Sequence, residues 1–262
     1  MPVVIALILL LVLASGAHAR DPTTLCTTES SSDRLEAVAD NGDLTLAGAG
    51  LARLADIRLP ESGPEREQAL GRLRGQTGAD LAVQSNGRRD RWNRIEAHLR
   101  TLTSPEVDLA ADLVSAGPAL VDPAAAPVLC RTDLLAVENE ARQQGLGVWQ
   151  LERYKPASVA ELSRLLGLVG EFVLIEGRIR SVGERQSRTY LNFGSDWSHD
   201  VTVVLPKKAW LRLLDSGLSA DALRGRVVRV RGLVENAGGP ALTVTAPETI
   251  EVLQDDRRQP SR

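Results

Sequence analysis

Short segments in which apolar and polar residues alternate, separated by turn residues, most strongly limit how this 262-residue chain can fold. In the first half they predict strands over 34–39, 43–47, 51–57, 79–84 and 92–99. Asn41-Gly42 is a strong signal for a hairpin turn between the first two strands. Helices are expected over 64–73, 104–115 and 128–143. Five short strands with a helix between the third and fourth predict a small closed β-barrel.

The second half has the same kind of pattern. It predicts a helix over 206–214 and strands over 171–182, 189–193, 201–205, 225–235, 241–245 and 250–253. The predicted fold class is mainly β with helices, as two tandem five-stranded barrels of the oligonucleotide/oligosaccharide-binding (OB) type. The helical pattern stops near 154–156, which divides the chain into domains 20–153 and 154–254. The polar tail, 255–262, is expected to be disordered.

Composition excludes several classes of protein. The chain is 43% apolar and 25% charged, with 22 Gly and 13 Pro, which excludes a mainly disordered or collagen-like protein. Its net charge of −3 excludes a strongly cationic protein that holds nucleic acid by bulk charge alone. Aromatic residues make up only 3%, so the cores must consist of Leu, Val, Ala and Ile.

The N-terminus is typical of an exported protein. An apolar run over 3–13 is followed by small residues and Ala17-His18-Ala19, which predicts a signal peptide over 1–19. The run is too short to cross a membrane, which needs about 20 apolar residues. We therefore expect a periplasmic or extracellular protein with no membrane contact after cleavage. In an oxidising compartment Cys26 and Cys130 are expected to form a disulfide; the alternative is two unrelated buried thiols.

Three motifs in the first half resemble those of the staphylococcal-nuclease (thermonuclease) domain, over residues 33–149. They are Arg-Leu-Ala-Asp-Ile-Arg-Leu-Pro-Glu at 53–61, Asp-Arg-Trp-Asn-Arg at 90–94, and a helix with Glu138 and Ala-Arg at 141–142 before Gly-Leu-Gly-Val-Trp at 145–149. The resemblance implies a five-stranded barrel with three helices. It also implies calcium-dependent hydrolysis of phosphodiester bonds, in which a glutamate assists the attacking water and two arginines neutralise charge on phosphorus. By this resemblance the catalytic residues are Arg53, Glu61 and Arg94.

At the positions where that family has its calcium ligands, this chain has other residue types. The second aspartate falls on Arg58, and the first falls on Gly42 or, with a one-residue slip, on Asp43. A guanidinium offers no oxygen to a hard dication and stays protonated, so it repels the ion. Arg58 is expected to pair with Glu61, Asp56 or Asp43 in place of calcium. The alternative is that Asp56, two residues away on the same strand, replaces the lost ligand. We expect no cofactor, and calcium only if the chain is active.

In the second half the segment 189–197 carries the candidate ligand contacts. Alternation places Leu191 and Phe193 in the core and Tyr190 and Asn192 on the outside. Several arginines lie near these two residues in the sequence, namely Arg178, Arg180, Arg185 and Arg188. An exposed aromatic ring among arginines is typical of a site for single-stranded nucleic acid or a nucleotide. The alternative is a solvated, partly basic barrel wall.

Other conspicuous residues are given structural roles. Trp92 and Trp149 are expected in the core, and His98 has no second His or Cys at zinc-ligand spacing. Arg226, Arg229 and Arg231 alternate with valines and are expected to be surface charges.

Three functions remain open. The first is an exported protein with a degenerate nuclease fold that binds nucleic acid or a related ligand without efficient hydrolysis. The second is an active metal-dependent phosphodiesterase that cleaves DNA or RNA. The third is a periplasmic scaffold for an unknown protein partner.

Overall fold

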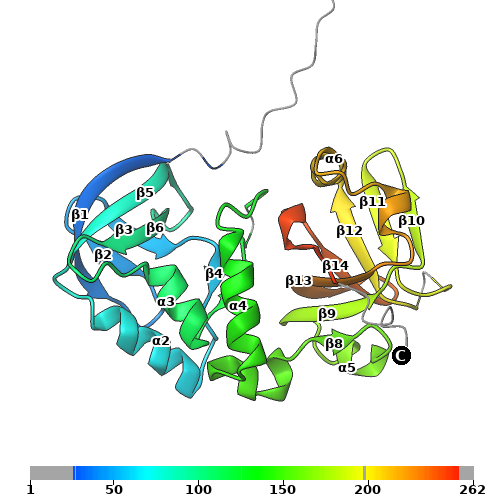
Figure 1. The fold of residues 1–262 in the computed structure, drawn as a ribbon, viewed down its shortest axis with the longest axis horizontal. Coiled ribbons are helices and arrows are strands. Elements are labelled where there is room, and N and C mark those ends of the chain that lie inside the picture. The colour runs from blue at the N-terminus through cyan, green and yellow to red at the C-terminus, as the bar shows by residue number, and fades with distance from the viewer. Residues whose placement is uncertain (1–25, 27, 125, 197–198, 254–262) are drawn as a thin grey trace, which may run out of the picture.

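The computed structural model describes residues 26, 28–124, 126–196 and 199–253, so the predicted signal peptide and C-terminal tail lie outside it. The described chain folds into two lobes joined through α4 and the segment after it (Figure 1). In this part of the chain no helix is long and apolar enough to cross a membrane. Cys26 and Cys130 form a disulfide across 104 positions, as the sequence predicts.

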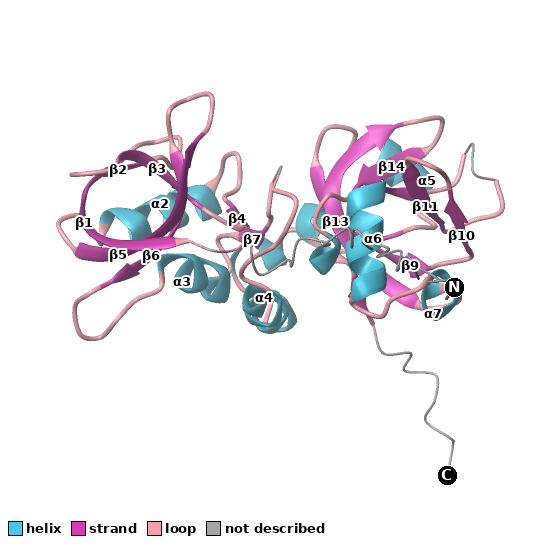
Figure 2. Ribbon diagram, turned by 90° about the horizontal axis from the view of Figure 1, so that it is seen from above, coloured by secondary structure: helices cyan, strands magenta, loops and turns pink. Residues whose placement is uncertain are grey.

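The first lobe is a closed five-stranded barrel with the strand order β1-β2-β3-β6-β5, which confirms the predicted barrel. Its strands are β1 (Glu29–Val38), β2 (Leu44–Leu46), β3 (Gly50–Leu54), β5 (Asp80–Arg89) and β6 (Ile95–Thr101). Figure 2 shows them as a ring seen from above. Alternate side chains such as Leu35, Leu44, Ala52 and Leu81 are completely buried inside it. The barrel therefore forms because one face of every strand is apolar.

Three helices pack on this barrel: α2 (Pro64–Arg74), α3 (Leu109–Ala116) and α4 (Asp133–Gln143). Helix α2 begins at Pro64, as predicted. Helix α3 begins five residues later than predicted, because the Asp108 side chain accepts the Ala111 N–H and caps the helix there. Helix α4 also begins late, at Asp133, after the disulfide residue Cys130.

The predicted strand over 51–57 is interrupted. Asp56 has a φ of 62°, a left-handed conformation that no regular strand accommodates. After it the chain leaves the barrel as β4 (Ile57–Arg58), which pairs with β7 (Leu120–Val121) next to α4. This small two-stranded sheet lies between the barrel and the second lobe (Figure 2).

The second lobe is one eight-stranded sheet, with more strands than the five expected; a closed second barrel stays a prediction. Its strands are β8 (Ala157–Ser158), β9 (Phe172–Arg178), β10 (Ser181–Glu184), β11 (Arg188–Asn192), β12 (Thr202–Pro206), β13 (Val227–Asn236), β14 (Pro240–Thr243) and β15 (Glu251–Val252). Seven of them follow the order β10-β11-β12-β14-β13-β9-β8, and β15 pairs with β13. Helices α5 (Leu162–Leu166), α6 (Lys207–Asp215) and α7 (Ala220–Leu223) complete the lobe, and short 3₁₀ turns span Gly147–Gln150, Glu152–Tyr154 and Pro247–Thr249.

The predicted strand over 171–182 is split between two neighbours. The Ile179 N–H donates to the Arg226 carbonyl, whereas the Arg180 N–H donates to the Asn192 carbonyl. The chain thus changes partners at this point, from the β13 side of the sheet to β11, and forms β9 and β10 instead of one strand.

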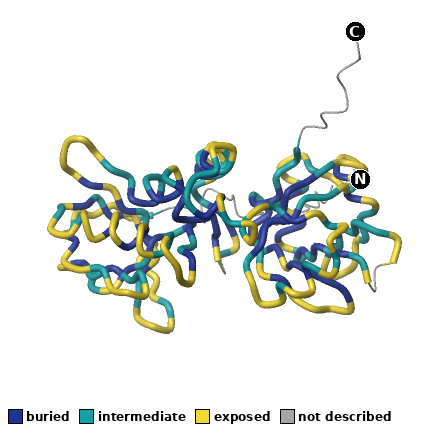
Figure 3. The backbone as a smooth tube through the Cα atoms, turned by 90° about the horizontal axis from the view of Figure 1, so that it is seen from below, coloured by how far each residue is buried: buried dark blue, intermediate teal, exposed yellow. Residues whose placement is uncertain are grey.

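The two lobes meet at a buried interface (Figure 3). Leu174 of β9 packs in one apolar cluster with Leu120, Val148 and Trp149 of the first lobe, so Trp149 is in the core as predicted. Trp92, by contrast, is 54% exposed and is not a core residue. It follows Asp90, whose carboxylate accepts the Trp92 N–H and holds this segment as a surface turn before β6.

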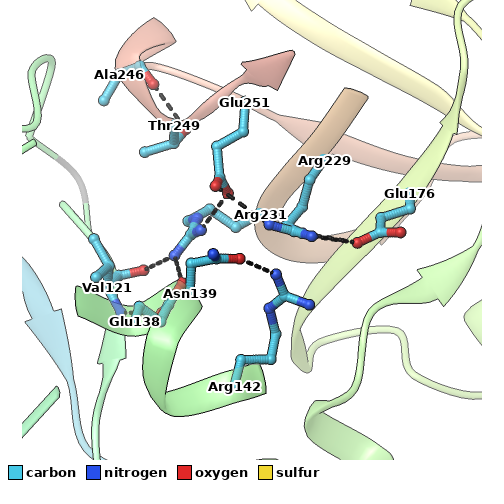
Figure 4. A network of polar contacts seen from close by, with 10 residues as sticks. All are labelled: Val121, Glu138, Asn139, Arg142, Glu176, Arg229, Arg231, Ala246, Thr249 and Glu251. Atoms are coloured by element: carbon cyan, nitrogen blue, oxygen red, sulfur yellow. Dashed lines mark hydrogen bonds and ion pairs between the residues drawn. The ribbon is translucent and has the colours of Figure 1, made fainter. Parts of the chain in front are cut away.

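An ion pair is buried at the centre of this interface (Figure 4). Arg231 Nη1 lies 2.6 Å from Glu138 Oε2, and the two side chains are only 1% and 2% exposed. Arg231 also pairs with Glu251 at 2.6 Å, and the other oxygen of Glu138 accepts the Val121 N–H at 2.6 Å. The prediction of surface charges is therefore wrong for Arg231, and for Arg229, which is buried and pairs with Glu176. The first lobe covers this face of β13.

We predict that Glu138→Ala lowers the free energy of unfolding by about 3–5 kcal/mol, because it leaves a guanidinium buried without one of its carboxylates. Urea denaturation followed by tryptophan fluorescence measures the change. The matched control is Asp112→Ala, which breaks the exposed Arg72–Asp112 pair and should cost less than about 1 kcal/mol. Equal effects of the two variants would contradict the prediction.

Candidate functional site

A pocket of about 280 Å³ in the first lobe contains most of the predicted catalytic and metal residues. It lies between the 41–43 turn, β3, β4 and the start of α2. Among its lining residues are four arginines and one carboxylate: Arg53, Arg58, Arg66, Arg94 and Asp43. We call it the arginine pocket.

Asp43 is held by Arg94 and by its own turn. Arg94 Nη1 lies 2.7 Å from Asp43 Oδ1, and the two side chains are 13% and 14% exposed. The Asn41 amide donates to the other Asp43 oxygen at 2.8 Å. Arg94 is fixed on its far side by two donations to Asp90 Oδ2, at 2.9 and 2.8 Å. The carboxylate that would bind calcium is thus already neutralised by a cation.

Arg58 pairs with Asp122, with 2.8 Å between Nε and Oδ2. Its guanidinium also lies 4.9 Å from the centroid of the Phe172 ring, in the second lobe. The expected partners Glu61, Asp56 and Asp43 are therefore wrong. The reason is that β4 leaves the barrel to pair with β7, and Asp122 directly follows β7.

Asp56 faces away from the arginine pocket. Its carboxylate accepts the Arg131 N–H at 2.9 Å and lies 3.7 Å from His98 Nε2. It does not line the arginine pocket. The expectation that Asp56 and Arg58 share a face is wrong, because the left-handed residue at 56 breaks the alternation. Burial raises the pKa of Asp56 to about 6.

Arg53 and Arg66 give the pocket its uncompensated positive charge. Arg53 lines the pocket, and within the described chain its side chain has no hydrogen bond or ion pair. Arg66 donates to two backbone carbonyls, those of Pro60 and Asp40, which hold it in place without neutralising it. Glu61 is exposed and does not line the pocket, so the predicted catalytic glutamate is not brought to the two arginines.

These residues do not fit a calcium ion. Calcium takes six to eight oxygen ligands at about 2.3–2.6 Å, usually with several carboxylates. Across the described ranges no three His, Cys, Asp or Glu residues are grouped so that they could hold a metal. In the arginine pocket the one lining carboxylate, Asp43, is engaged by Arg94. The chemistry that this pocket supports is the binding of an anion.

A second, larger pocket of about 550 Å³ lies on the sheet of the second lobe. Tyr190 and Asn192 of β11 line it, with Thr202 of β12 and Thr243 of β14. We call it the sheet pocket. The face predicted for Tyr190 and Asn192 therefore borders a concave surface, whereas Leu191 is completely buried as predicted.

Only part of the predicted basic group reaches the sheet pocket. Arg188 and Arg185, next to the β10–β11 turn, line it. The exposed Arg180 does not, and Arg178 donates to the Gly225 carbonyl instead. The physical reason is the split between β9 and β10, which turns Arg178 and Arg180 toward other strands.

The sequence analysis missed Arg66 and Asp122. Arg66 lies in the first turn of α2, and nothing in its neighbourhood indicates that it reaches back to the 40–60 region. Asp122 is 64 positions from Arg58, so only the pairing of β4 with β7 reveals the contact. Trp92, also misassigned, places an exposed ring beside Arg94, whose guanidinium lies 4.5 Å from the ring centroid.

In comparisons with known proteins, no family model and no curated protein matches this chain. The resemblance to thermonucleases is therefore carried only by the three motifs and stays a prediction.

We predict that Asp56 makes the protein more stable at acid pH. The Asp56 carboxyl titrates near 3.8 in the unfolded chain, so the folded protein binds the carboxyl proton more tightly. The contribution of Asp56 to the free energy of unfolding is therefore fully present below about pH 4. It is lost as the pH rises through about 6. Asp56→Asn keeps the acceptor and suits the left-handed backbone. Between pH 4 and 7 the free energy of unfolding of the wild type should fall by about 2 kcal/mol relative to that of this variant.

Urea denaturation at several pH values measures this difference. Burial lowers the pKa of His98, which lies 3.7 Å from Asp56, so the comparison is repeated with His98→Asn in both proteins to remove its titration. In the control variant Asp112→Asn, which changes a carboxylate near the surface, the free energy of unfolding should vary with pH as it does in the wild type. Parallel profiles for wild type and Asp56→Asn would show that Asp56 has an ordinary pKa.

Proposed function

We propose that this protein is an exported binding protein that holds a phosphate group of nucleic acid or of a nucleotide in the arginine pocket, without efficient hydrolysis. One observation carries the proposal: four arginines line this pocket, and among the residues that the structure describes carboxylates neutralise only Arg58 and Arg94. The partly buried Arg53 and Arg66 remain as positive charges toward the cavity. Guanidinium groups bind phosphate oxygens through planar, charge-assisted hydrogen bonds.

The fold supports a nuclease ancestry for this pocket. The order of strands and helices in the first lobe agrees with what the resemblance to thermonucleases implies, and the two matching arginines, Arg53 and Arg94, line one cavity. We propose that the lobe is a degenerate member of that fold. In the second lobe β9 and β10 follow each other in the chain and pair with β13 and β11, on opposite sides of the sheet order. We propose that they act as one bent strand that closes an OB-like barrel.

Two changes argue against efficient hydrolysis. Arg94 occupies the carboxylate of Asp43, and Arg58 adds a second cation where the family has a ligand. Glu61 is exposed and does not line the cavity that Arg53 lines. The binding role of the arginines survives these changes, because it needs neither a metal nor a general base. The disulfide supports export, since such bonds persist in oxidising compartments.

We predict that Arg53→Ala weakens binding of single-stranded oligonucleotides about tenfold at low salt. The loss corresponds to one charge-assisted hydrogen bond, about 1.5 kcal/mol. The slope of log affinity against log salt should also fall by about 0.7, because one phosphate contact disappears. Fluorescence anisotropy with a labelled oligothymidine measures both. Arg34→Ala is the matched control, because Arg34 is an exposed arginine on β1 outside the described pockets.

Failure of the wild-type protein to bind any single-stranded oligonucleotide at low salt would overturn the proposal and favour a protein-interaction role. Equal weakening by Arg34→Ala and Arg53→Ala would show that binding reflects overall charge and not the arginine pocket.

We predict that the mature protein does not cleave DNA or RNA in a calcium-dependent reaction. A gel assay with and without calcium, alongside calorimetric titration of calcium, tests this. Glu61→Gln should leave oligonucleotide binding unchanged, because Glu61 lies outside the pocket. Cleavage that requires calcium and disappears in Glu61→Gln would establish an active nuclease instead.

A further inference from the structure

We propose that the arginine pocket and the sheet pocket are the two ends of one groove that binds an extended single strand of nucleic acid across both lobes. The inference rests on the proposed function and adds to it the form of the ligand, a single strand longer than one pocket can hold.

A third pocket, of about 270 Å³, connects the two ends at the lobe interface. We call it the interlobe pocket. It is bounded by Arg58 and Asp122 from the first lobe and by Phe172 and Leu233 from the second. Because both lobes supply its walls, the pocket exists only when the two lobes are docked.

The three pockets are contiguous, because they share lining residues. Arg58 and Ala124 line both the arginine pocket and the interlobe pocket. Glu235 and Thr243 line both the interlobe pocket and the sheet pocket. A ligand that passes Arg58 at one end and Thr243 at the other would therefore run from each pocket to its neighbour across the molecule.

The chemistry along this path suits a single strand. Arg53 and Arg66 offer positive charge at the first end, and Arg188, which has no side-chain partner within the described chain, offers it at the other. Between them lie apolar surfaces, including Leu233, which is 46% exposed, and the half-buried ring of Phe172. Tyr190 adds a second aromatic ring. Bases stack on such rings while guanidinium groups contact phosphates.

The carboxylates of the sheet pocket argue for base contacts there. Glu235 and Asp200 line it, and both repel phosphate oxygens. They accept hydrogen bonds from the exocyclic amino groups of bases, as do the oxygens of Asn192 and Thr202. A duplex keeps its bases paired and stacked inside, so it cannot offer them to this surface. The lining therefore favours a single strand over a double-stranded ligand.

The interface also fixes the distance between the two ends. Besides the buried Arg231–Glu138 pair, Arg212 donates to the Pro127 carbonyl and Thr245 donates to the Ala126 carbonyl, and these contacts tie the lobes together. A groove that is rigid before binding loses less entropy when the strand is bound.

The test compares a deoxycytidine trinucleotide with a twelve-nucleotide oligodeoxycytidine, because cytosine carries the exocyclic amino group that the carboxylates would accept from and one OB-type domain covers about 4–16 nucleotides. Anisotropy of the labelled long strand and calorimetry of the trinucleotide give the two affinities. We expect the long strand to bind at least tenfold more tightly, with one strand per protein. Arg53→Ala and Tyr190→Ala, at opposite ends, should each weaken it about tenfold.

The deciding variant is Leu233→Glu, which places a negative charge in the middle of the groove on an already exposed side chain. It should weaken the long strand about tenfold and leave the trinucleotide unchanged. Leu51→Glu is the matched control, since Leu51 is 40% exposed on β3 and lines none of the described pockets. Thr243→Glu, at an exposed position shared by two pockets, tests the same path if Leu233→Glu does not fold.

The outcomes separate the two proposals. If Arg53→Ala weakens the long strand while Leu233→Glu and Thr243→Glu bind it as the wild type does, the arginine pocket is a phosphate site and the groove is wrong. Two long strands bound per protein would also overturn the groove, because the pockets would then be independent. If no strand binds to the wild type at all, both proposals fail.

Discussion

The buried pair between Glu138 and Arg231 is the interaction on which the arrangement of both lobes depends. Glu138 accepts from Arg231 with one oxygen and from the Val121 N–H with the other. Val121 belongs to β7, which holds β4, and β4 carries Arg58. The Glu138 carboxylate and the pairing of β7 with β4 thus connect Arg231 of the second lobe with Arg58 at the edge of the arginine pocket. A buried pair of this kind adds little net stability, but a single partner left alone is costly, so it favours one arrangement over others.

By the proposed function, the arginine pocket binds an anion at the place where the resemblance to thermonucleases implies a metal ion. A calcium ion and an arginine both bring positive charge, but only the metal is a Lewis acid that can coordinate the attacking water and lower its pKa. Arg94 and Arg58 pair with Asp43 and Asp122, so Arg53 and Arg66 leave the cavity positively charged. Hydrolysis also needs a group that activates the attacking water, and Glu61, the base that the resemblance implies, does not line the cavity.

The sequence predicted the features that depend on local patterns. Alternation along each strand identified the barrel, the Asn41-Gly42 turn joined its first strands, and the pair of cysteines in a chain expected to be exported predicted the disulfide. The motifs at 53–61 and 90–94 brought Arg53 and Arg94 to one cavity.

The remaining features depend on contacts between distant segments, which no local pattern contains. Alternation wrongly placed Asp56 beside Arg58, because it assumes a regular strand and the backbone at Asp56 is left-handed. Arg231 has the spacing of a surface charge, and only the docking of α4 against β13 makes it a buried one. The partner of Arg58 follows a strand that pairs with β4 from 64 positions away. Trp92 lies outside the core, because the turn that Asp90 holds places it on the surface.

The shared cluster of Leu120, Val148, Trp149 and Leu174 means that the two halves of this chain are not interchangeable modules. Cut near residue 154, the first half would present an apolar patch and an orphaned carboxylate to water, and the second would present the guanidinium of Arg231. A different domain could replace the second half only if it placed a basic side chain against Glu138, buried to the same extent as Arg231. The boundary that the sequence indicates near residue 154 therefore lies between two parts of the chain that depend on each other to bury their interface.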